Sequence, residues 1–407
     1  MSAQHAGGQP HGALRSQPAH RCAIRGSHDA RPAHGRGTAV ASRCSGGGGT
    51  GLSATSFRAA QRSSGQGCRH QGRLLQNRGD TIPGFEADMV FPERFSNLPD
   101  YAFPRLRKLL DVHEPGGEPI AMTIGEPRHP FPEWVGDVIA GSLEGFGRYP
   151  ANDGTPGLQT AIARWIARRY GVNVSADRQI MALNGTREGL FNACMALCPE
   201  RKGGRQPVVL MPNPFYQVYA VAALAVGAEP VYVPATEATG DLPDYTALPQ
   251  DILDRTAIAY ICSPANPQGA VADAAYWARL VALAERHDFQ IFADECYSEI
   301  YRNAPPPGAL AAAEANGAHP ERVVIFHSLS KRSNMPGLRS GFVAGGQESI
   351  ARIKQLRSYA GAPLPLPLQA VAERAWSDET HVEQSRALYQ EKYRIADEVM
   401  AGVPGYR

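Results

Sequence analysis

Lysine is the residue that this sequence lacks most conspicuously. The 407 residues contain five lysines and 36 arginines, so arginine has replaced lysine almost everywhere. One of the five, Lys331, lies in "HSLSKRSNMPGLRSGFVAGG", a stretch of serines and turn-forming residues. Arginine cannot take over chemistry that needs an unprotonated amine, because its guanidinium stays protonated. A lysine kept in this setting is therefore a candidate nucleophile, although a plain surface lysine is the competing interpretation.

Long apolar runs and regular cysteine spacing are also missing. No stretch of 18 apolar residues occurs, and the longest run, "YAVAALAVGA" from Tyr219, is too short to span a membrane. No apolar segment follows Met1, which argues against a secretory signal. The cysteines form no C-x-x-C pair, and we interpret them as reduced thiols of a cytoplasmic protein.

Acidic residues are nearly absent from the first 80 positions. That segment has eleven arginines, six histidines and fifteen glycines, but only Asp29 and Asp80 as acids. Without an apolar period it cannot bury enough surface to offset its ordering entropy, so we predict that residues 1–84 are a disordered Arg/Gly/Ser-rich extension. A transit peptide, a nucleic-acid-binding tail and a non-functional or wrongly started extension all remain open; we favour the last and expect no nucleic-acid partner.

From Asp153 onward, helical and strand patterns alternate. The stretch "GTPGLQTAIARWIARRYG" places Leu158, Ile162 and Trp165 on one helical face. Short apolar runs bounded by turn residues follow, and amphipathic segments separate several of them. This pattern predicts an α/β fold, a three-layer αβα sandwich with a mostly parallel sheet. The runs are "PVVLMP", "PVYVP", "AIAYICSP", "QIFADE", "RVVIFHS" and "GFVAG".

Polar residues follow three of these runs at the point where each strand is expected to end. Asn266 comes after one run, Asp294 ends another, and Ser328 and Lys331 follow a third. The carboxyl ends of parallel strands meet at one edge of a sheet, which is where such folds bind ligands. The sequence therefore predicts one site built from these residues.

The neighbours of Lys331 predict a phosphate site. Ser328, Ser330 and Ser333 supply hydroxyls, and Arg339 follows eight residues after the lysine. Hydroxyls beside a guanidinium suit a phosphate, and a lysine amine reacts with aldehydes. Together they indicate a phosphorylated aldehyde cofactor.

Asp294 and Tyr297 have both a structural and a functional interpretation. A carboxylate at the end of an apolar strand must be paired, either as a helix cap or salt bridge or with a pyridinium nitrogen. Tyr297, three residues on, is within range of a phenolic oxygen on the same ring, or it is a core aromatic.

Three weaker signals point the same way. Asn266 in "SPANPQG" is either a turn residue or a donor to a cofactor oxygen. The backbone N–H groups of Gly185, Thr186 and Arg187 in "NGTREG" open a helix and suit a phosphate. Tyr216 in "NPFYQVY" is either a ring-stacking aromatic or part of the core.

Taken together, these motifs resemble the class I/II aminotransferases, the pyridoxal-phosphate enzymes of fold type I, from about Arg94 to the C-terminus. The resemblance implies that Lys331 binds pyridoxal 5'-phosphate covalently and is catalytic together with Asp294 and Tyr297. It implies that Asp294 binds the pyridine nitrogen, and that Asn266 and Tyr297 bind the phenolic oxygen.

The same resemblance assigns the remaining ligands. Ser328, Arg339 and the amides near Thr186 match phosphate ligands, and Tyr216 matches the ring-stacking aromatic. Tyr149, in "RYPANDGTPGL", matches a tyrosine that reaches the phosphate of the neighbouring subunit, which implies a homodimer.

The resemblance also implies where the substrate binds. Gly125, in "IGEP", matches a glycine beside the substrate carboxylate, and Asn266 is expected there too. The partners are then an amino acid and a 2-oxo acid, with no metal and no membrane. The family's carboxylate-binding arginine is expected beyond Arg407, unless Arg332 or Arg357 replaces it.

In detail, the stretches "SLSKRSNMPGLRSGFVAG" and "LNGTREGLF" are similar in sequence to those of the N-succinyldiaminopimelate aminotransferases of bacterial lysine synthesis. The expected reaction uses N-succinyl-LL-diaminopimelate and 2-oxoglutarate. Another class I/II aminotransferase, a C–S lyase, a transcription regulator with an aminotransferase-like domain and an inactive truncated product are the alternatives.

The domain organisation follows from these assignments. We expect an N-terminal arm and small-domain segment over residues 85–140 and a large cofactor domain over 141–365. Residues 366–407 are expected to form a linker helix and the start of a smaller α+β domain that is truncated at its C-terminus. A long charged helix is predicted from about His381 to Ala401.

Overall fold

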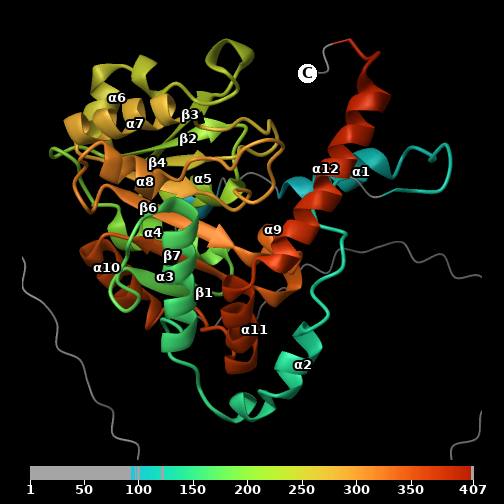
Figure 1. The fold of residues 1–407 in the computed structure, drawn as a ribbon. Coiled ribbons are helices and arrows are strands. Elements are labelled where there is room, and N and C mark those ends of the chain that lie inside the picture. Colours follow the sequence, from blue (N-terminus) through green and yellow to red (C-terminus); the bar gives the residue numbers. More distant parts are fainter. Residues whose placement is uncertain (1–92, 97, 99–100, 121–122, 405–407) are drawn as a thin grey trace, which may run out of the picture. The chain divides into compact units, whose positions relative to one another are not determined.

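The computed structural model describes residues 93–96, 98, 101–120 and 123–404 (Figure 1). The chain separates into two units, Met1–Phe85 and Glu86–Arg407, and the described residues all belong to the second. The disorder predicted for residues 1–84 therefore falls outside the described residues.

A seven-stranded sheet forms the centre of the second unit. The strand order is β1-β7-β6-β5-β4-β2-β3, and β7 is antiparallel to both of its neighbours while the other pairs are parallel. Each of the apolar runs forms one of these strands, which confirms the mostly parallel sheet. The strands are β1 Ile180–Leu183, β2 Val208–Asn213, β3 Glu229–Pro234, β4 Thr256–Cys262, β5 Gln290–Asp294, β6 Val323–Ser328 and β7 Gly341–Gly345.

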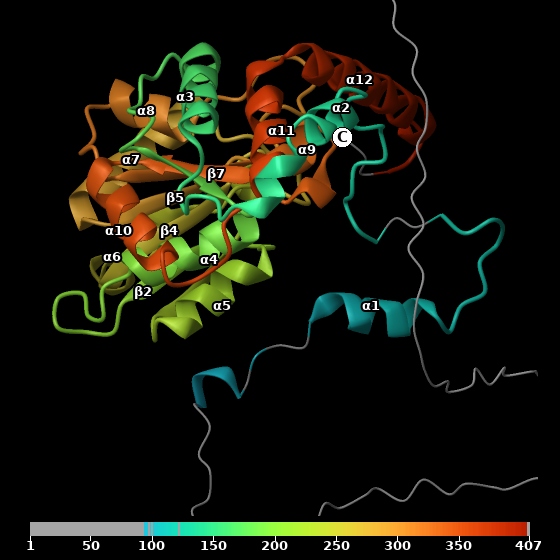
Figure 2. The same ribbon diagram turned by 90° about the horizontal axis from the view of Figure 1, so that it is seen from below.

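Helices cover both faces of the sheet and complete the three layers (Figures 1 and 2). Buried side chains of α4, α5 and α10 pack on one face, and those of α3, α7, α8 and α11 pack on the other. The helices are α1 Ala102–Leu110, α2 Val135–Ala140, α3 Pro156–Tyr170, α4 Thr186–Leu197, α5 Gln217–Ala225, α6 Gln250–Arg255, α7 Ala274–His287, α8 Ala309–Ala315, α9 Leu329–Arg332, α10 Gln347–Arg357, α11 Leu366–Ser377 and α12 Thr380–Met400, with short 3-10 turns η1 Glu93–Phe95, η2 Leu143–Gly147, η3 Glu237–Thr239, η4 Tyr245–Ala247 and η5 Pro336–Leu338.

Alternation along the strands divides the core into two parts. In β2, Val208 and Leu210 join the cluster under α3 and α7, whereas Val209 and Met211 join the cluster under α4 and α5. Successive side chains of a strand point to opposite faces, so a continuous apolar run fills both sides of the sheet. This is why the runs read as uninterrupted apolar sequence.

Helix α3 forms where the sequence predicts it. The Thr155 side chain accepts a hydrogen bond of 3.3 Å from the Leu158 backbone N–H, and Pro156 occupies the first turn. Gly171 ends the helix in the left-handed conformation, at φ 74°. The predicted apolar face is buried against the sheet.

Strand directions bring several loops to one edge of the sheet. The ends of β4, β5 and β6 lie at that edge because these strands are parallel. Ser328 at the end of β6 pairs with Gly341 at the start of β7, and Leu183 at the end of β1 pairs with the same glycine. The segments around Gly185 and Arg339 therefore start at the carboxyl edge as well.

The proposed subdivision of residues 86–407 stays a prediction. Helix α11, expected to begin the last segment, packs against α3, with the Trp165 and Trp376 ring centres 4.8 Å apart. Helix α12 closely matches the long charged helix that the sequence predicts. Within the described residues, no helix is long and apolar enough to cross a membrane.

Candidate active site

Lys331 lies in α9, immediately after β6, at the carboxyl edge of the sheet. Its Nζ donates a hydrogen bond to the Gly125 carbonyl and lies 5.7 Å from the centre of the Tyr297 ring. Burial lowers the pKa of Lys331 from its ordinary value, against the opposing effect of Cys296 and Glu126. A lysine with a lowered pKa is more often unprotonated, which favours its use as a nucleophile or base.

Asp294 presents a buried carboxylate at the end of β5. The Tyr219 hydroxyl donates a hydrogen bond of 2.8 Å to Oδ2, and the Cys296 backbone N–H donates one of 3.3 Å to Oδ1. Burial raises the pKa of Asp294, although these hydrogen bonds act in the opposite direction. Both donors are neutral, so a cationic partner such as a pyridinium would relieve the cost of burying this charge.

Asn266 and Tyr297 meet at the same edge. The Asn266 Nδ2 donates a hydrogen bond of 2.8 Å to the Tyr297 hydroxyl, joining the loops that follow β4 and β5. Burial raises the pKa of Tyr297, so the phenol stays neutral at physiological pH. An amide and a neutral phenol side by side offer two donors to one oxygen of a ligand.

Gly185 and Arg339 form one side of an anion cradle. Gly185 precedes the first residue of α4 and has a φ of 87°, which favours glycine. A Cβ at this position would lie 2.8 Å from Cζ of Arg339, so the guanidinium lies directly against the start of the helix. Helix N–H groups beside a guanidinium suit a phosphate.

Hydroxyl groups from β6 and α9 line the same region. The Ser328 Oγ accepts a hydrogen bond of 3.1 Å from the Ser330 backbone N–H, and the two hydroxyl oxygens are 3.0 Å apart. The Thr186 methyl lies 3.3 Å from where a Cβ of Gly341 would be, next to the end of β6. The Thr186 hydroxyl lies 3.3 Å from the Cys296 Sγ. These contacts link the start of α4 to the strand ends that carry Asp294 and Ser328.

Tyr216 precedes α5 and is tied to the start of α4. The Arg187 Nε donates a hydrogen bond of 2.7 Å to the Tyr216 hydroxyl. Arg187 thus contributes its side chain to holding Tyr216, in addition to the backbone N–H that the sequence singled out. The Tyr216 ring is partly exposed and therefore available to a planar ligand.

Gly125 and Tyr149, which the sequence also predicts for the site, are exposed rather than packed among the other site residues. Gly125 is exposed, and its backbone carbonyl accepts a hydrogen bond from the Lys331 Nζ. The Tyr149 side chain is fully exposed, so it packs on nothing in the described part of its own chain. Arg332 and Arg357, the two suggested substitutes for a carboxylate-binding arginine, are buried and form ion pairs with Glu379 and Glu188.

The sequence reasoning missed two residues of the site, Tyr219 and Cys296. Tyr219 was noted only as the start of an apolar run, yet it is the side-chain donor to Asp294. Its signal was the spacing of three from Tyr216, because residues three apart on a helix share a face. Cys296 lies between two predicted residues, and only the turn after β5 places it against Thr186.

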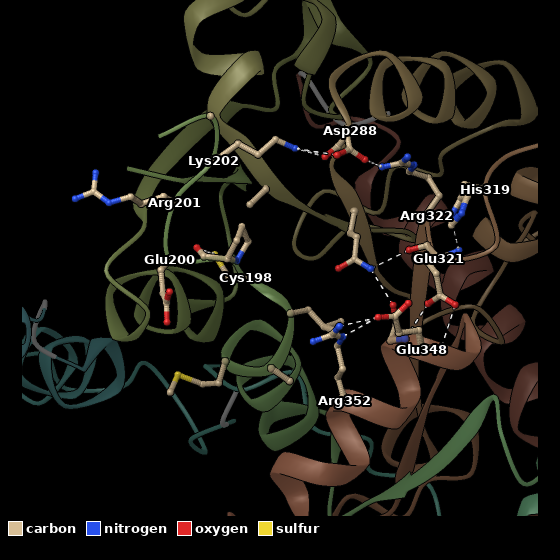
Figure 3. A pocket seen from close by; sticks show the side chains of 18 residues that line it. Cys198, Glu200, Arg201, Lys202, Asp288, His319, Glu321, Arg322, Glu348 and Arg352 are labelled. Atoms are coloured by element: carbon tan, nitrogen blue, oxygen red, sulfur yellow. Dashed lines mark hydrogen bonds and ion pairs between the residues drawn. The ribbon is translucent and has the colours of Figure 1, made fainter. Parts of the chain in front are cut away.

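A surface pocket among the described residues lies away from Lys331 and Asp294 (Figure 3). It has a volume of about 1140 Å³ and is lined at the amino ends of β4, β5 and β6 by Ala257, Gln290 and Arg322. Charged side chains that line it pair with one another, as Arg322 does with Asp288 at 3.1 Å and Arg352 with Glu348 at 2.6 Å. In the part of the chain that the structure describes, no group of three or more His, Cys, Asp or Glu side chains could hold a metal ion.

The residues at the carboxyl edge fit pyridoxal phosphate by their chemistry. The cradle at Gly185 and Arg339 suits its phosphate, and the buried Asp294 suits its ring nitrogen. Asn266 with Tyr297 suits the phenolic oxygen, and Lys331 suits the aldehyde.

Comparisons with known proteins agree with this chemistry. The sequence profile described as "Aminotransferase class I and II" matches residues 118–403. The LL-diaminopimelate aminotransferase of Dehalococcoides mccartyi strain 195 is 34% identical over 309 residues, covering 75% of this chain and 77% of that protein. A second relative of the same name, from Moorella thermoacetica, is 34% identical and covers 74% and 76%.

Solved structures give the same result. A crystal structure of an aminotransferase from Neisseria meningitidis Z2491 has a TM-score of 0.73 and 37% identity, covering 77% of this chain and 80% of that one. A probable N-succinyldiaminopimelate aminotransferase from Thermus thermophilus has a TM-score of 0.61 and 29% identity, covering 69% and 73%. The chain therefore belongs to the class I and II aminotransferases.

Proposed function

We propose that this aminotransferase takes its amino group from a donor with the diaminopimelate skeleton and passes it to 2-oxoglutarate. Members of its family depend on pyridoxal phosphate, which is accordingly the cofactor of this chain. The convergence of Lys331, Asp294 and the Gly185–Arg339 cradle on one edge of the sheet supports the transamination chemistry. The names of the relatives support the choice of donor.

The binding roles follow from the contacts of each residue. The N–H groups of Gly185, Thr186 and Arg187, with Ser328 and Arg339, bind the phosphate. Asn266 and Tyr297 donate to the phenolic oxygen, and the Tyr216 ring covers one face of the cofactor. Gly125 and Asn266 lie where the substrate carboxylate binds. Each of these assignments is a proposal that mutagenesis can test.

The catalytic roles belong to three side chains. When bound, the cofactor ring acts as an electron sink for negative charge at the substrate Cα. The Lys331 Nζ takes the proton from that Cα and later returns one, as general base and then acid. Asp294 keeps the proton on the ring nitrogen, and Tyr297 holds the phenolic oxygen in place. A lowered pKa of Lys331 favours the base form that this step needs.

Two forms of the donor are candidates. The N-succinyl form is the first, supported by the sequence resemblance and by the similar Thermus thermophilus structure of a probable N-succinyldiaminopimelate aminotransferase. Free LL-diaminopimelate is the second, supported by the LL-diaminopimelate aminotransferases that are 34% identical to this chain. Either donor would place the reaction in lysine biosynthesis.

We further propose a homodimer in which Tyr149 reaches the phosphate held by the partner subunit. The support is the complete exposure of the Tyr149 side chain in its own chain, together with its place in "RYPANDGTPGL". A cytoplasmic location belongs to the same proposal.

The experiment measures glutamate formed from 2-oxoglutarate by the full chain loaded with pyridoxal phosphate. N-succinyl-LL-diaminopimelate and LL-diaminopimelate are compared as donors, with a Lys331→Ala variant as control. We expect one of the two to exceed common amino acids such as aspartate by at least about tenfold in kcat/KM. Equal rates with all donors, or release of pyruvate and ammonia from cystathionine, would favour the alternative aminotransferase or the C–S lyase.

A further inference from the structure

We propose that Tyr219 is a positioning residue for the cofactor: its hydroxyl keeps the Asp294 carboxylate ionised and aimed at the ring nitrogen. The inference rests on the role proposed for Asp294. It concerns a residue that neither the family motifs quoted above nor the comparisons assign to the site.

Tyr219 is fixed in place by its surroundings. It lies in the first turn of α5 and is only 1% exposed. Its ring stacks on that of Tyr260, with centres 4.4 Å apart and planes within 12°. The hydroxyl then has one evident partner, the Asp294 Oδ2 at 2.8 Å. A tyrosine held this firmly orients the carboxylate as well as bonding to it.

The hydrogen bond favours the charged form of Asp294. Burial raises the pKa of Asp294, and the bonds from Tyr219 and from Cys296 lower it again. Burial also raises the pKa of Tyr219 well above its ordinary value, so the phenol keeps its proton and acts as the donor. Without this hydroxyl, the buried carboxylate would keep only its hydrogen bonds from Cys296, and its pKa would rise further.

Several other titratable groups face Asp294. His327, from β6, also lowers the pKa of Asp294 through a Coulombic interaction. The remaining neighbours are neutral in their ordinary state, so they do not replace the Tyr219 hydroxyl. The titratable groups around Asp294 are Tyr216 and Tyr219 of the α5 region, Tyr260 and Cys262 of β4, Cys296 and Tyr297 after β5, and His327 of β6.

The same turn of α5 also positions Tyr216. The Tyr216 and Tyr219 ring centres are 5.8 Å apart in an edge-on arrangement, and Arg187 of α4 binds the Tyr216 hydroxyl. The start of α5 therefore positions both Tyr216, proposed to cover the cofactor ring, and Tyr219, proposed to orient the Asp294 carboxylate toward the ring nitrogen. A shift of this turn would disturb both together.

The test is a Tyr219→Phe variant of the full chain, with Tyr260→Phe as the matched control. Tyr260 is equally buried and stacks on the same ring, but its hydroxyl donates to the Leu190 carbonyl at 2.8 Å. The dissociation constant of pyridoxal phosphate is measured on the apo protein between about pH 5.5 and 9. Since a hydrogen bond to a charged group is lost, we expect Tyr219→Phe to weaken binding by about tenfold. The acid-side loss of affinity should also begin at a higher pH, while Tyr260→Phe leaves that pH unchanged.

An Asp294→Asn background provides the second comparison. There, Tyr219→Phe should change neither the dissociation constant nor its pH dependence, since no carboxylate remains to be held. This double variant also lacks the buried charge, so it is expected to fold even if Tyr219→Phe alone does not.

The outcomes are distinguishable. Identical affinities and pH profiles for the wild type and Tyr219→Phe overturn the inference, as does an equal loss in both backgrounds. Failure of the wild type to bind pyridoxal phosphate would instead contradict the cofactor site itself.

Discussion

The Nζ of Lys331 donates a hydrogen bond to the backbone carbonyl of Gly125, 206 residues earlier in the chain. This contact joins the segment before α2 to α9, and it brings the glycine proposed to bind the substrate carboxylate next to the proposed nucleophile. A carbonyl is a weak partner for an ammonium compared with a carboxylate, so the amine is not locked in its charged form. We expect the amine to leave this partner when it reacts with the cofactor.

Replacing Lys331 tests the nucleophile. Lys331→Arg keeps the positive charge but removes the reactive amine, so borohydride should no longer fix pyridoxal phosphate to the protein. Transaminase activity should fall by at least about a thousandfold, because a group essential to two steps is lost. Peptide mapping of the reduced protein identifies the labelled lysine. Lys354→Arg is the control, since Lys354 pairs with Asp153 away from the site; a label that stays after Lys331→Arg would contradict the assignment.

Asp294→Asn separates catalysis from stability. The raised pKa of Asp294 means that the folded protein holds this proton more tightly than the unfolded chain does. Protonated Asp294 therefore stabilises the folded state fully at pH values below its pKa in the unfolded chain. This stabilisation is lost as the pH rises through its pKa in the folded protein. At pH 8 the ionised carboxylate destabilises the apo protein, so Asp294→Asn should leave its thermal stability unchanged or higher.

The same variant should slow transamination by about a hundredfold to a thousandfold, because the charge opposite the ring nitrogen is gone. Thermal unfolding of the apo protein and kcat of the loaded protein are measured in parallel. An unchanged kcat would show that Asp294 is only structural.

Gly185→Ala tests the phosphate cradle. A Cβ here would contact the Arg339 guanidinium, at 2.8 Å from Cζ, and force it away from the start of α4. We expect the dissociation constant of pyridoxal phosphate to rise by about tenfold, while that of pyridoxal, which has no phosphate, changes little. Gly203→Ala is the matched control, because Gly203 also has a positive φ but has open space around it. Equal losses for both ligands would argue against a phosphate role.

Arg332 is expected to act on stability. Its guanidinium is buried between Trp165 and Trp376 and forms an ion pair of 2.7 Å with Glu379. Arg332→Ala leaves the packing incomplete and removes charge-assisted hydrogen bonds, and should lower the free energy of unfolding by about 1.5–3 kcal/mol. Urea unfolding of the apo protein measures this loss. Arg394→Ala, which breaks an exposed pair with Glu391, should change little; an equally small effect of Arg332→Ala would contradict the expectation.

Local patterns in the sequence predicted the strands and several of the helices, and they singled out the candidate residues of the site. The apolar runs form the strands because a parallel strand covered on both faces has to be apolar throughout. Lys331, Asp294 and Asn266 could be singled out because each follows a strand, and parallel strands end at one edge. The turn chemistry of "GTPG" was enough to place the start of α3.

The partners of those residues were decided only by the tertiary structure. Nothing local in "YAVAALAVGA" indicates that Tyr219 donates to Asp294, because the two are 75 residues apart. They meet because α5 packs on β2 and β3 and the Tyr219 ring stacks on Tyr260 of β4. The approach of Arg339 to Gly185 likewise depends on the antiparallel pairing of β7 with β1 and β6. Sequence periodicity reports which face of an element is buried, but the contacts across faces depend on strand order and register. For this reason the sequence by itself determined the strands and the main helices and singled out the candidate side chains, whereas the fold decided which of them lie together.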